Sequence, residues 1–179
     1  MTWDEQLFAY LDDLEQQAEG VFGIERDLEV AERAAAEYAA VTVASRLMAS
    51  VDSEVALQVQ GLGQLEGELR RVADGWLVLQ SPAQAWLVRL DAVLSIRGAS
   101  ARSIPEAAWP AAAKLGFGSA LRRLAEERDS CRMVLVDGSR LDVRVVRVGR
   151  DFVEVHSGDA TQTGLVRLAA IAAAGVAPG

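Results

Sequence analysis

Apolar side chains recur every three or four residues through the first part of the chain, the spacing that places them on one face of an α-helix. A first stretch has this pattern at Trp3, Leu7, Leu11, Leu14 and Ala18. A turn marked by two glycines follows at 20–23, and a second, alanine-rich stretch continues over 24–50. We therefore predict a hairpin of two helices over residues 1–53, with a dimeric coiled coil as the alternative.

From Val55 onward apolar and polar residues alternate, which is the period of a β-strand with one buried face. Five short segments of this kind, separated by turn residues, lie within 54–98: VALQVQ, LEGELRRV, GWLVLQ, WLVRL and AVLSI. Five more lie within 131–176: CRMVLV, SRLDVRVVRV, DFVEVH, GLVRL and AIAAAGV. The pattern predicts two groups of strands, which we call repeat one (54–98) and repeat two (131–176).

Repeat two matches repeat one position by position. At an offset of 76 residues, apolar positions of the first strands coincide: Val55, Leu57 and Val59 with Cys131, Met133 and Leu135. After a loop that is two residues longer in repeat two the offset becomes 78, and the tetrapeptide Leu-Val-Arg-Leu at 87–90 recurs at 165–168. Apolar positions keep their size while surface positions change, which indicates an internal duplication.

A predicted helix precedes each repeat, TVASRLMAS before the first and GSALRRLAEE before the second. A helix followed by five short, bent strands resembles the Sm-like and SH3-like small barrels, and the resemblance implies two such barrels in tandem. The predicted fold class is therefore α+β: a helical hairpin (1–53), a first small barrel (54–98), linker helices (99–130) and a second small barrel (131–176). In the barrels that the chain resembles, the fourth strand lies near an open edge. We predict that the two LVRL strands lie at a pseudo-twofold interface or at equivalent outer edges.

The net charge of −8 belongs to the N-terminal part of the chain. Residues 1–54 carry thirteen acidic and three basic side chains, whereas residues 55–179 carry thirteen acidic and fifteen basic ones. An acidic chain is a poor general binder of nucleic acid, although its arginine-rich second part is compatible with a local basic patch. The lone Cys131 excludes an internal disulfide, and no apolar run approaches the length of a membrane span. These features favour a cytoplasmic protein that does not enter a membrane.

Side chains suited to catalysis are scarce. The chain has one histidine, His156, and one cysteine, Cys131, which falls on the inward face of a predicted strand. The sequence has no cluster with metal-ligand spacing and no glycine-rich phosphate loop between a strand and a helix. We therefore predict a protein that is not an enzyme and has no catalytic, metal or cofactor-binding residues.

One segment favours nucleic-acid binding as an alternative. Residues 106–126, which include KLGFGSALRRLAE, resemble the end of Fis-type transcriptional regulators, a label carried by similar actinobacterial sequences of this length. That resemblance implies a helix-turn-helix in which Ser119, Arg122 and Arg123 face DNA. A diverged Sm-like RNA-binding protein is a further alternative, but Asp91 and Ala169 stand where such proteins have polar and basic contact residues.

The other candidate residues are surfaces for protein partners. Arg140 and Arg144 alternate outward on one predicted strand of repeat two, where repeat one has acidic residues. The docking candidates on the first predicted helix are Trp3, Leu7, Phe8 and Leu11. We predict a non-enzymatic protein-interaction or regulatory module that binds a protein partner, including a second copy of the same chain.

Overall fold

The computed structural model describes residues 3, 10, 11, 26, 29–127, 130–157 and 163–176. The chain divides into two compact units, Met1–Val41 and Thr42–Gly179. In the first unit, residues 29–39 form an α-helix that ends in a turn at Ala40. The other helix of the predicted hairpin falls mostly outside the described residues, so the hairpin stays a prediction.

The long helix predicted over 24–50 is wrong, because the chain leaves the helical conformation at Thr42. Thr42 is extended (φ −99°, ψ 159°), and Val43–Met48 forms a separate helix, α2. The Thr42 hydroxyl accepts a hydrogen bond from the Ser45 N–H, and the Ser45 hydroxyl accepts one from the Thr42 N–H, both at 3.1 Å. These two bonds form a capping box, which satisfies backbone donors at the start of a new helix.

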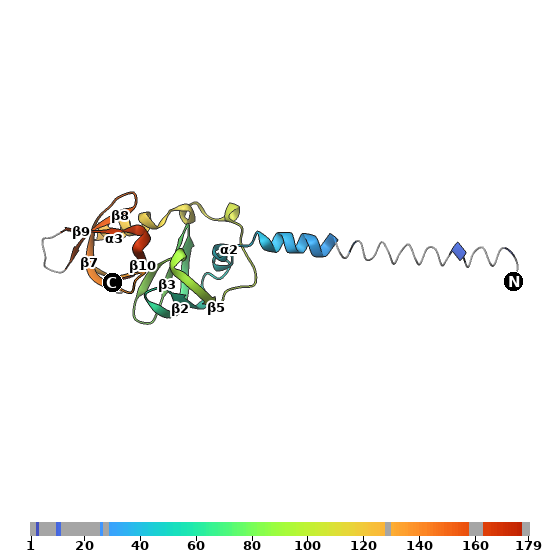
Figure 1. Cartoon of the computed structure of the whole chain (residues 1–179), viewed down its shortest axis with the longest axis horizontal. Helices are drawn as coiled ribbons and strands as arrows, with labels where there is room; N and C mark the ends of the chain where they lie inside the picture. Colours follow the sequence, from blue (N-terminus) through green and yellow to red (C-terminus); the bar gives the residue numbers. More distant parts are fainter. Residues whose placement is uncertain are drawn as a thin grey trace. The chain divides into compact units, whose positions relative to one another are not determined.

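The second unit is an α+β structure built on one ten-stranded antiparallel sheet (Figure 1). Repeat one contributes β1 (Glu54–Val59), β2 (Gly63–Ala73), β3 (Trp76–Gln80), β4 (Ala85–Arg89) and β5 (Val93–Arg97). Repeat two contributes β6 (Ser130–Leu135), β7 (Arg140–Val148), β8 (Phe152–Ser157), β9 (Thr163–Arg167) and β10 (Ile171–Val176). The 3-10 turns η2 (Glu106–Ala108) and η3 (Ala111–Lys114) and the helix α3 (Phe117–Glu127) connect the repeats. Two further 3-10 turns, η1 (Leu90–Ala92) and η4 (Leu168–Ala170), precede the last strand of each repeat.

Both halves of the sheet have the same strand order. It is β5-β1-β2-β3-β4 in repeat one and β10-β6-β7-β8-β9 in repeat two. The register of the second and third strands shifts between Leu69 and Arg71 in repeat one, and between Val145 and Arg147 in repeat two. These positions differ by the same 76 residues that align the two sequences, so equivalent bulges bend both halves. The predicted five strands per repeat, each group preceded by a helix, are confirmed.

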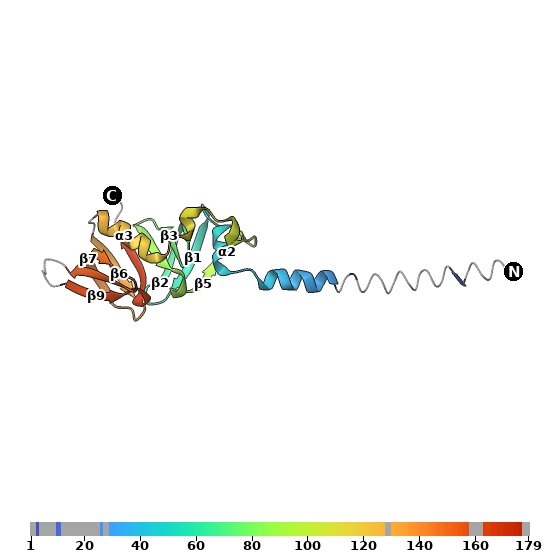
Figure 2. The ribbon, with the colours of Figure 1, turned by 90° about the horizontal axis from the view of Figure 1, so that it is seen from above.

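The two predicted small barrels are not closed. A closed five-stranded barrel would pair its fourth strand with its fifth. Instead β4 pairs with β10, with Trp86 opposite Gly175 and Leu87 opposite Ala174, so the two halves form one open sheet. Figure 2 shows the strands of repeat two, in orange and red, continuing from those of repeat one, in teal and green. The backbone groups that would close repeat one are used to join it to repeat two.

The two LVRL segments therefore occupy different places in the sheet. The first contributes to β4, which lies in the interior, and the second contributes to β9, which is the last strand. Because the fourth strand of one repeat meets the fifth strand of the other, two different surfaces are in contact and the joint is head-to-tail. The predictions of a pseudo-twofold interface and of equivalent outer edges are both wrong.

One apolar cluster extends through both repeats. Its largest fully buried side chains include Leu47, Leu57, Leu69, Leu77, Leu79, Leu121, Met133 and Ile171. Leu47 comes from α2 and Leu121 from α3, so each helix covers part of the sheet. Among the described residues, no helix is long and apolar enough to cross a bilayer.

Candidate interaction site

Backbone pairing and one arginine hold the two repeats together. Ala85 to Val88 of β4 pair with Val176 to Ala173 of β10. Next to this ladder, Arg89 Nε donates a hydrogen bond to the Ile171 carbonyl at 2.9 Å, and Nη2 donates one to the Ala169 carbonyl at 2.8 Å. Nη1 forms an ion pair with Asp91 at 3.0 Å. The arginine of the first LVRL thus binds the backbone of the other repeat.

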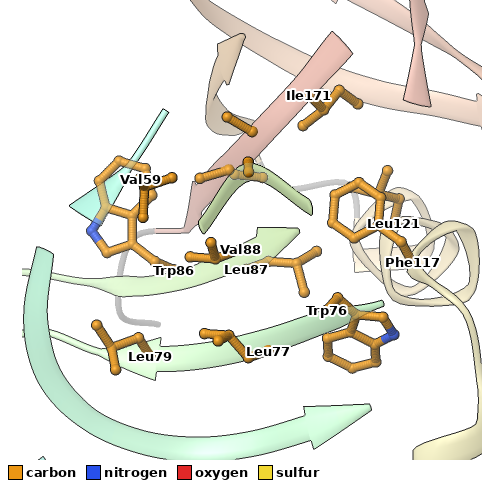
Figure 3. Close-up of a cluster of buried hydrophobic side chains, with 14 of the residues drawn as sticks. Val59, Trp76, Leu77, Leu79, Trp86, Leu87, Val88, Phe117, Leu121 and Ile171 are labelled. Carbon is orange, nitrogen blue, oxygen red and sulfur yellow. The ribbon is translucent and has the colours of Figure 1, made fainter. Parts of the chain in front are cut away.

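An apolar groove of about 700 Å³ lies between β3, β4 and α3. Trp76, Val78 and Leu87 line it from the sheet, and Leu124 lines it from α3. Figure 3 shows Trp76 and Leu87 on the side of the sheet nearest to α3. The Trp76 indole N–H donates to the Leu115 carbonyl at 2.7 Å, so the ring forms an apolar wall with its polar atom already satisfied.

Charged side chains surround the groove. Arg71 extends from β2, while Arg122, Arg123 and Glu126 extend from α3. Arg123 forms ion pairs with Glu126 at 3.3 Å and with Glu127 at 3.0 Å. Because two carboxylates balance Arg123, this side chain contributes little to attracting an anionic ligand.

The three residues predicted to face DNA lie together on α3, but the helix-turn-helix is absent. Residues 106–114 form the 3-10 turns η2 and η3 where a first α-helix was expected. Proline is the residue before each turn, and proline lacks the backbone N–H that a continuing helix needs. Ser119, Arg122 and Arg123 line the groove over repeat one, and Arg122 Nη1 donates to Ser119 Oγ at 3.3 Å. DNA binding by these side chains stays a prediction.

The strand β9 ends the sheet on one side, and its side chains differ in exposure from their equivalents on β4. Leu165 is 69% exposed, whereas the equivalent Leu87 is 7% exposed. Arg167 is exposed, whereas the side chain of the equivalent Arg89 is 16% exposed. Strand β10 of repeat two pairs with β4, whereas no further described strand pairs with the outer side of β9.

The strand β5 ends the sheet on the other side and shows the same contrast with β10. Leu94 is 63% exposed, whereas the equivalent Ala172 is fully buried. A groove of about 320 Å³ runs along β5 and is lined by Val43 of α2 together with Leu94 and Ile96. Each end of the sheet therefore carries an exposed apolar surface at positions that the joint between the repeats buries.

The predicted basic face of repeat two has mixed charge. Arg140 and Arg144 are exposed on β7, as expected. Between them on the same strand, Asp142 binds Arg132 through two hydrogen bonds of 2.9 and 3.3 Å. The hydrogen bonds from Arg132 lower the pKa of the Asp142 carboxyl. This carboxylate breaks the positive surface that the sequence suggested, and binding of a partner by Arg140 and Arg144 stays a prediction.

The lone cysteine and the lone histidine of the sequence lie in different surroundings. Cys131 is buried, and desolvation together with the nearby Asp142 raises its pKa from 9.0 to about 11, so the thiol is protonated at neutral pH. His156 hydrogen-bonds the Thr163 hydroxyl at 3.1 Å. Within the part of the chain that the structure describes, no three His, Cys, Asp or Glu side chains gather into a metal-binding group.

Two of the predicted docking residues of the first unit can be described. Trp3 is 73% exposed and Leu11 is 44% exposed. Leu7 and Phe8 lie outside the described residues. A docking role for these four side chains stays a prediction.

Sequence reasoning missed the joint between the repeats and the groove between β3, β4 and α3. A signal for the joint was present in the repeated LVRL. Arg89 and Arg167 are identical although the residues two positions later, Asp91 and Ala169, differ. An arginine kept at a position where neighbouring surface residues change indicates a specific partner, and here the partner is the backbone of the adjoining repeat.

Comparisons of the chain with known protein families, with curated proteins and with solved structures found no match in any of the three. The conclusions about function therefore rest on the geometry of this chain. That geometry consists of an open sheet with two exposed ends and an apolar groove with a charged rim.

Proposed function

We propose that the protein is a non-enzymatic, cytoplasmic protein-interaction module that associates with itself. The observation that carries this proposal is the unequal burial of Leu87 and Leu165, which are 7% and 69% exposed at equivalent positions. An unpaired edge strand that exposes a large apolar side chain is a template for binding another chain. The two ends of the sheet are therefore the surfaces on which the proposal depends.

The scarcity of reactive groups supports a binding role over catalysis. The buried Cys131 thiol has a pKa of about 11, which makes it a poor nucleophile. The larger groove is lined mainly by apolar side chains such as Trp76 and Leu87. Such a groove suits the apolar side chains of a protein ligand.

The first unit has a second role in the proposal. The predicted N-terminal helix would dock a protein partner through Trp3, Leu7, Phe8 and Leu11. The tandem small-barrel resemblance also stays part of the proposal, with the two barrels opened and merged into one sheet. Replacing Trp3 and Leu11 together by Glu separates docking through the helix from association through the sheet.

The mass of the purified full chain, measured by sedimentation over a wide range of concentrations, tests the proposal. We expect species heavier than the 19.2 kDa of one chain, with a fraction that rises with concentration. A mass of one chain at every concentration would overturn self-association.

DNA binding through α3 is the second candidate, and the exposure of Arg122 on the groove rim favours it. Labelled duplex DNA would be titrated at low and at near-physiological salt with the wild type and with R122A/R123A. Phosphate contacts release counterions, so specific loss of a salt-sensitive complex in the variant would support this candidate. Absence of binding at low salt would exclude it.

A further inference from the structure

We infer that successive chains join head to tail, with β9 of one chain pairing with β5 of the next in the register of the joint between the repeats. This inference rests on the proposed self-association and specifies its surface and its partner, a second copy of this chain. The joint within the chain is the template, because it pairs a fourth strand (β4) with a fifth strand (β10). Each chain has one other fourth strand and one other fifth strand, and these are the two ends of its sheet.

The offset of 78 residues between the repeats converts each internal pair into an intermolecular one. The internal pairs are Trp86–Gly175, Leu87–Ala174 and Val88–Ala173. The corresponding intermolecular pairs are Gly164–Arg97, Leu165–Ile96 and Val166–Ser95. Opposite residues of an antiparallel pair lie on the same face, so Leu165 and Ile96 would meet on the face that carries Leu87 at the internal joint.

Large and small side chains match across both joints. At the internal joint Trp86 lies opposite Gly175, and a Cβ added to Gly175 would overlap the Gln84 side-chain amide and lie 3.0 Å from the Trp86 ring. At the proposed joint the glycine is on the fourth strand, as Gly164, and the larger side chain is Arg97 on the fifth strand. Each pair therefore has room for one large side chain, which close packing between strands requires.

Three exposed apolar side chains gather at the proposed joint. Val43, Leu94 and Leu165 are 59%, 63% and 69% exposed. Val43 and Leu94 line the groove beside β5, just as Ala120 of α3 lines the groove into which Leu87 projects. Leu165 of a neighbouring chain would enter the groove beside β5 and cover the other two side chains, which removes apolar surface from water.

Arg167 supplies the polar part of the joint. Its equivalent, Arg89, donates to the carbonyls of Ala169 and Ile171. The same positions in repeat one are Asp91 and Val93. Arg167 would thus donate to the Asp91 and Val93 carbonyls of the next chain. The repeated LVRL has one explanation in both places: its strand pairs with a fifth strand, and its arginine binds carbonyls in the turn before that strand and at the strand's first residue.

Two single-site variants that each block one end of the sheet test this inference. L165D blocks β9 and leaves β5 intact, whereas L94D blocks β5 and leaves β9 intact. An aspartate placed in either apolar contact would be buried without a partner. We expect each variant alone to sediment as one chain. An equimolar mixture should form a complex of twice the 19.2 kDa of one chain, because one intact β9 meets one intact β5.

V146D is the matched control. Val146 is an exposed apolar residue at the bulge of β7, inside the sheet, so this variant should associate like the wild type.

The outcomes separate the inference from the proposed function. Heavier species in the wild type that persist in both variants would overturn the head-to-tail joint and leave self-association through another surface. A wild type that sediments as one chain would overturn both. Loss of association in L165D with full association in L94D would indicate a symmetric contact between two β9 strands and would also overturn the inference.

The variant R167Q tests the polar part of the joint. R167Q should weaken association about tenfold if Arg167 makes its two hydrogen bonds, and an unchanged dissociation constant would contradict that role.

Discussion

Leu87 and Leu165 occupy the same position in two repeats with the same strand order, yet Leu87 is buried on a strand that pairs with repeat two and Leu165 is mostly exposed on the last strand of the sheet. Arg89 and Arg167 differ in the same way, since Arg89 binds the backbone of the other repeat and Arg167 is exposed. The four residues share one tetrapeptide sequence, so the adjoining repeat accounts for the difference between them. The exposed surface of each repeat therefore depends on which strand pairs with it.

The largest difference is expected when both leucines receive the same substitution. Because Leu87 is 7% exposed, L87D buries a charge and should lower the free energy of unfolding by about 3–5 kcal/mol. L165D places the charge in water and should change it by less than about 0.5 kcal/mol. Urea unfolding at low protein concentration measures both, and equal effects would show that the adjoining repeat does not determine the burial of Leu87.

Two glycines of one turn differ in the same way, because only one of them contacts repeat two. Gly61 (φ +75°) packs against the Leu135 carbonyl of repeat two, whereas Gly63 (φ +94°) has nothing within 4 Å of an added Cβ. Both G61A and G63A carry the cost of a left-handed backbone, about 1–2 kcal/mol. G61A must also displace the backbone of repeat two, so we expect it to be the more destabilising by about 1–3 kcal/mol in urea unfolding. Equal losses would mean that this contact between the repeats is easily displaced.

The two arginines give a smaller effect on the stability of the isolated chain. R89Q removes the donors to two carbonyls at the joint and should lower the free energy of unfolding by about 1.5–3 kcal/mol. R167Q should leave thermal and urea unfolding of the single chain unchanged, because no second chain is bound. A loss of stability in R167Q at low protein concentration would mean that Arg167 is bonded within its own chain.

The smallest effect concerns the thiol of repeat two and its aliphatic equivalent in repeat one. Burial raises the pKa of Cys131 to about 11, so the unfolded chain loses this proton at lower pH than the folded chain. Stability should therefore be complete below about pH 9 and should fall by about 2 kcal/mol as the pH rises toward 11. C131V, which installs the residue found at Val55, should remove this part of the pH dependence. An identical pH profile in C131V would assign the loss to other groups.

The strands were predictable because each has local signals. Alternation with a period of two marks their buried faces, and the Asp74-Gly75 turn, with Gly75 at φ +77°, fixes one hairpin. The break at Thr42 was missed because the apolar stripe continues across it, while the deciding capping box consists of two polar residues three positions apart. Ser119, Arg122 and Arg123 were correctly grouped on one helix, since helical spacing is also local.

Closure of the barrels was not predictable from the same signals. Strand β4 has two available fifth strands, β5 and β10, whose backbone groups are chemically alike. The choice between them depends on the side chains across the pair, such as Gly175 opposite Trp86, and on where α3 covers Leu87. The Trp86–Gly175 pair joins residues 89 positions apart, and α3 lies thirty or more positions from Leu87, so neither periodicity nor turn chemistry reports these contacts. The groove was missed because its walls come from repeat one and from α3, which only the tertiary fold brings together.

The linker over 99–130 places the two repeats on one chain, and this has a consequence for the order of assembly. A covalent link holds β10 near β4 at a high effective concentration, so their pairing does not depend on how much protein is present. Pairing between chains has no such link and follows mass action. The dilution at which β9 and β5 separate would therefore leave the internal joint intact, so that a single chain is the unit that dissociates and reassembles.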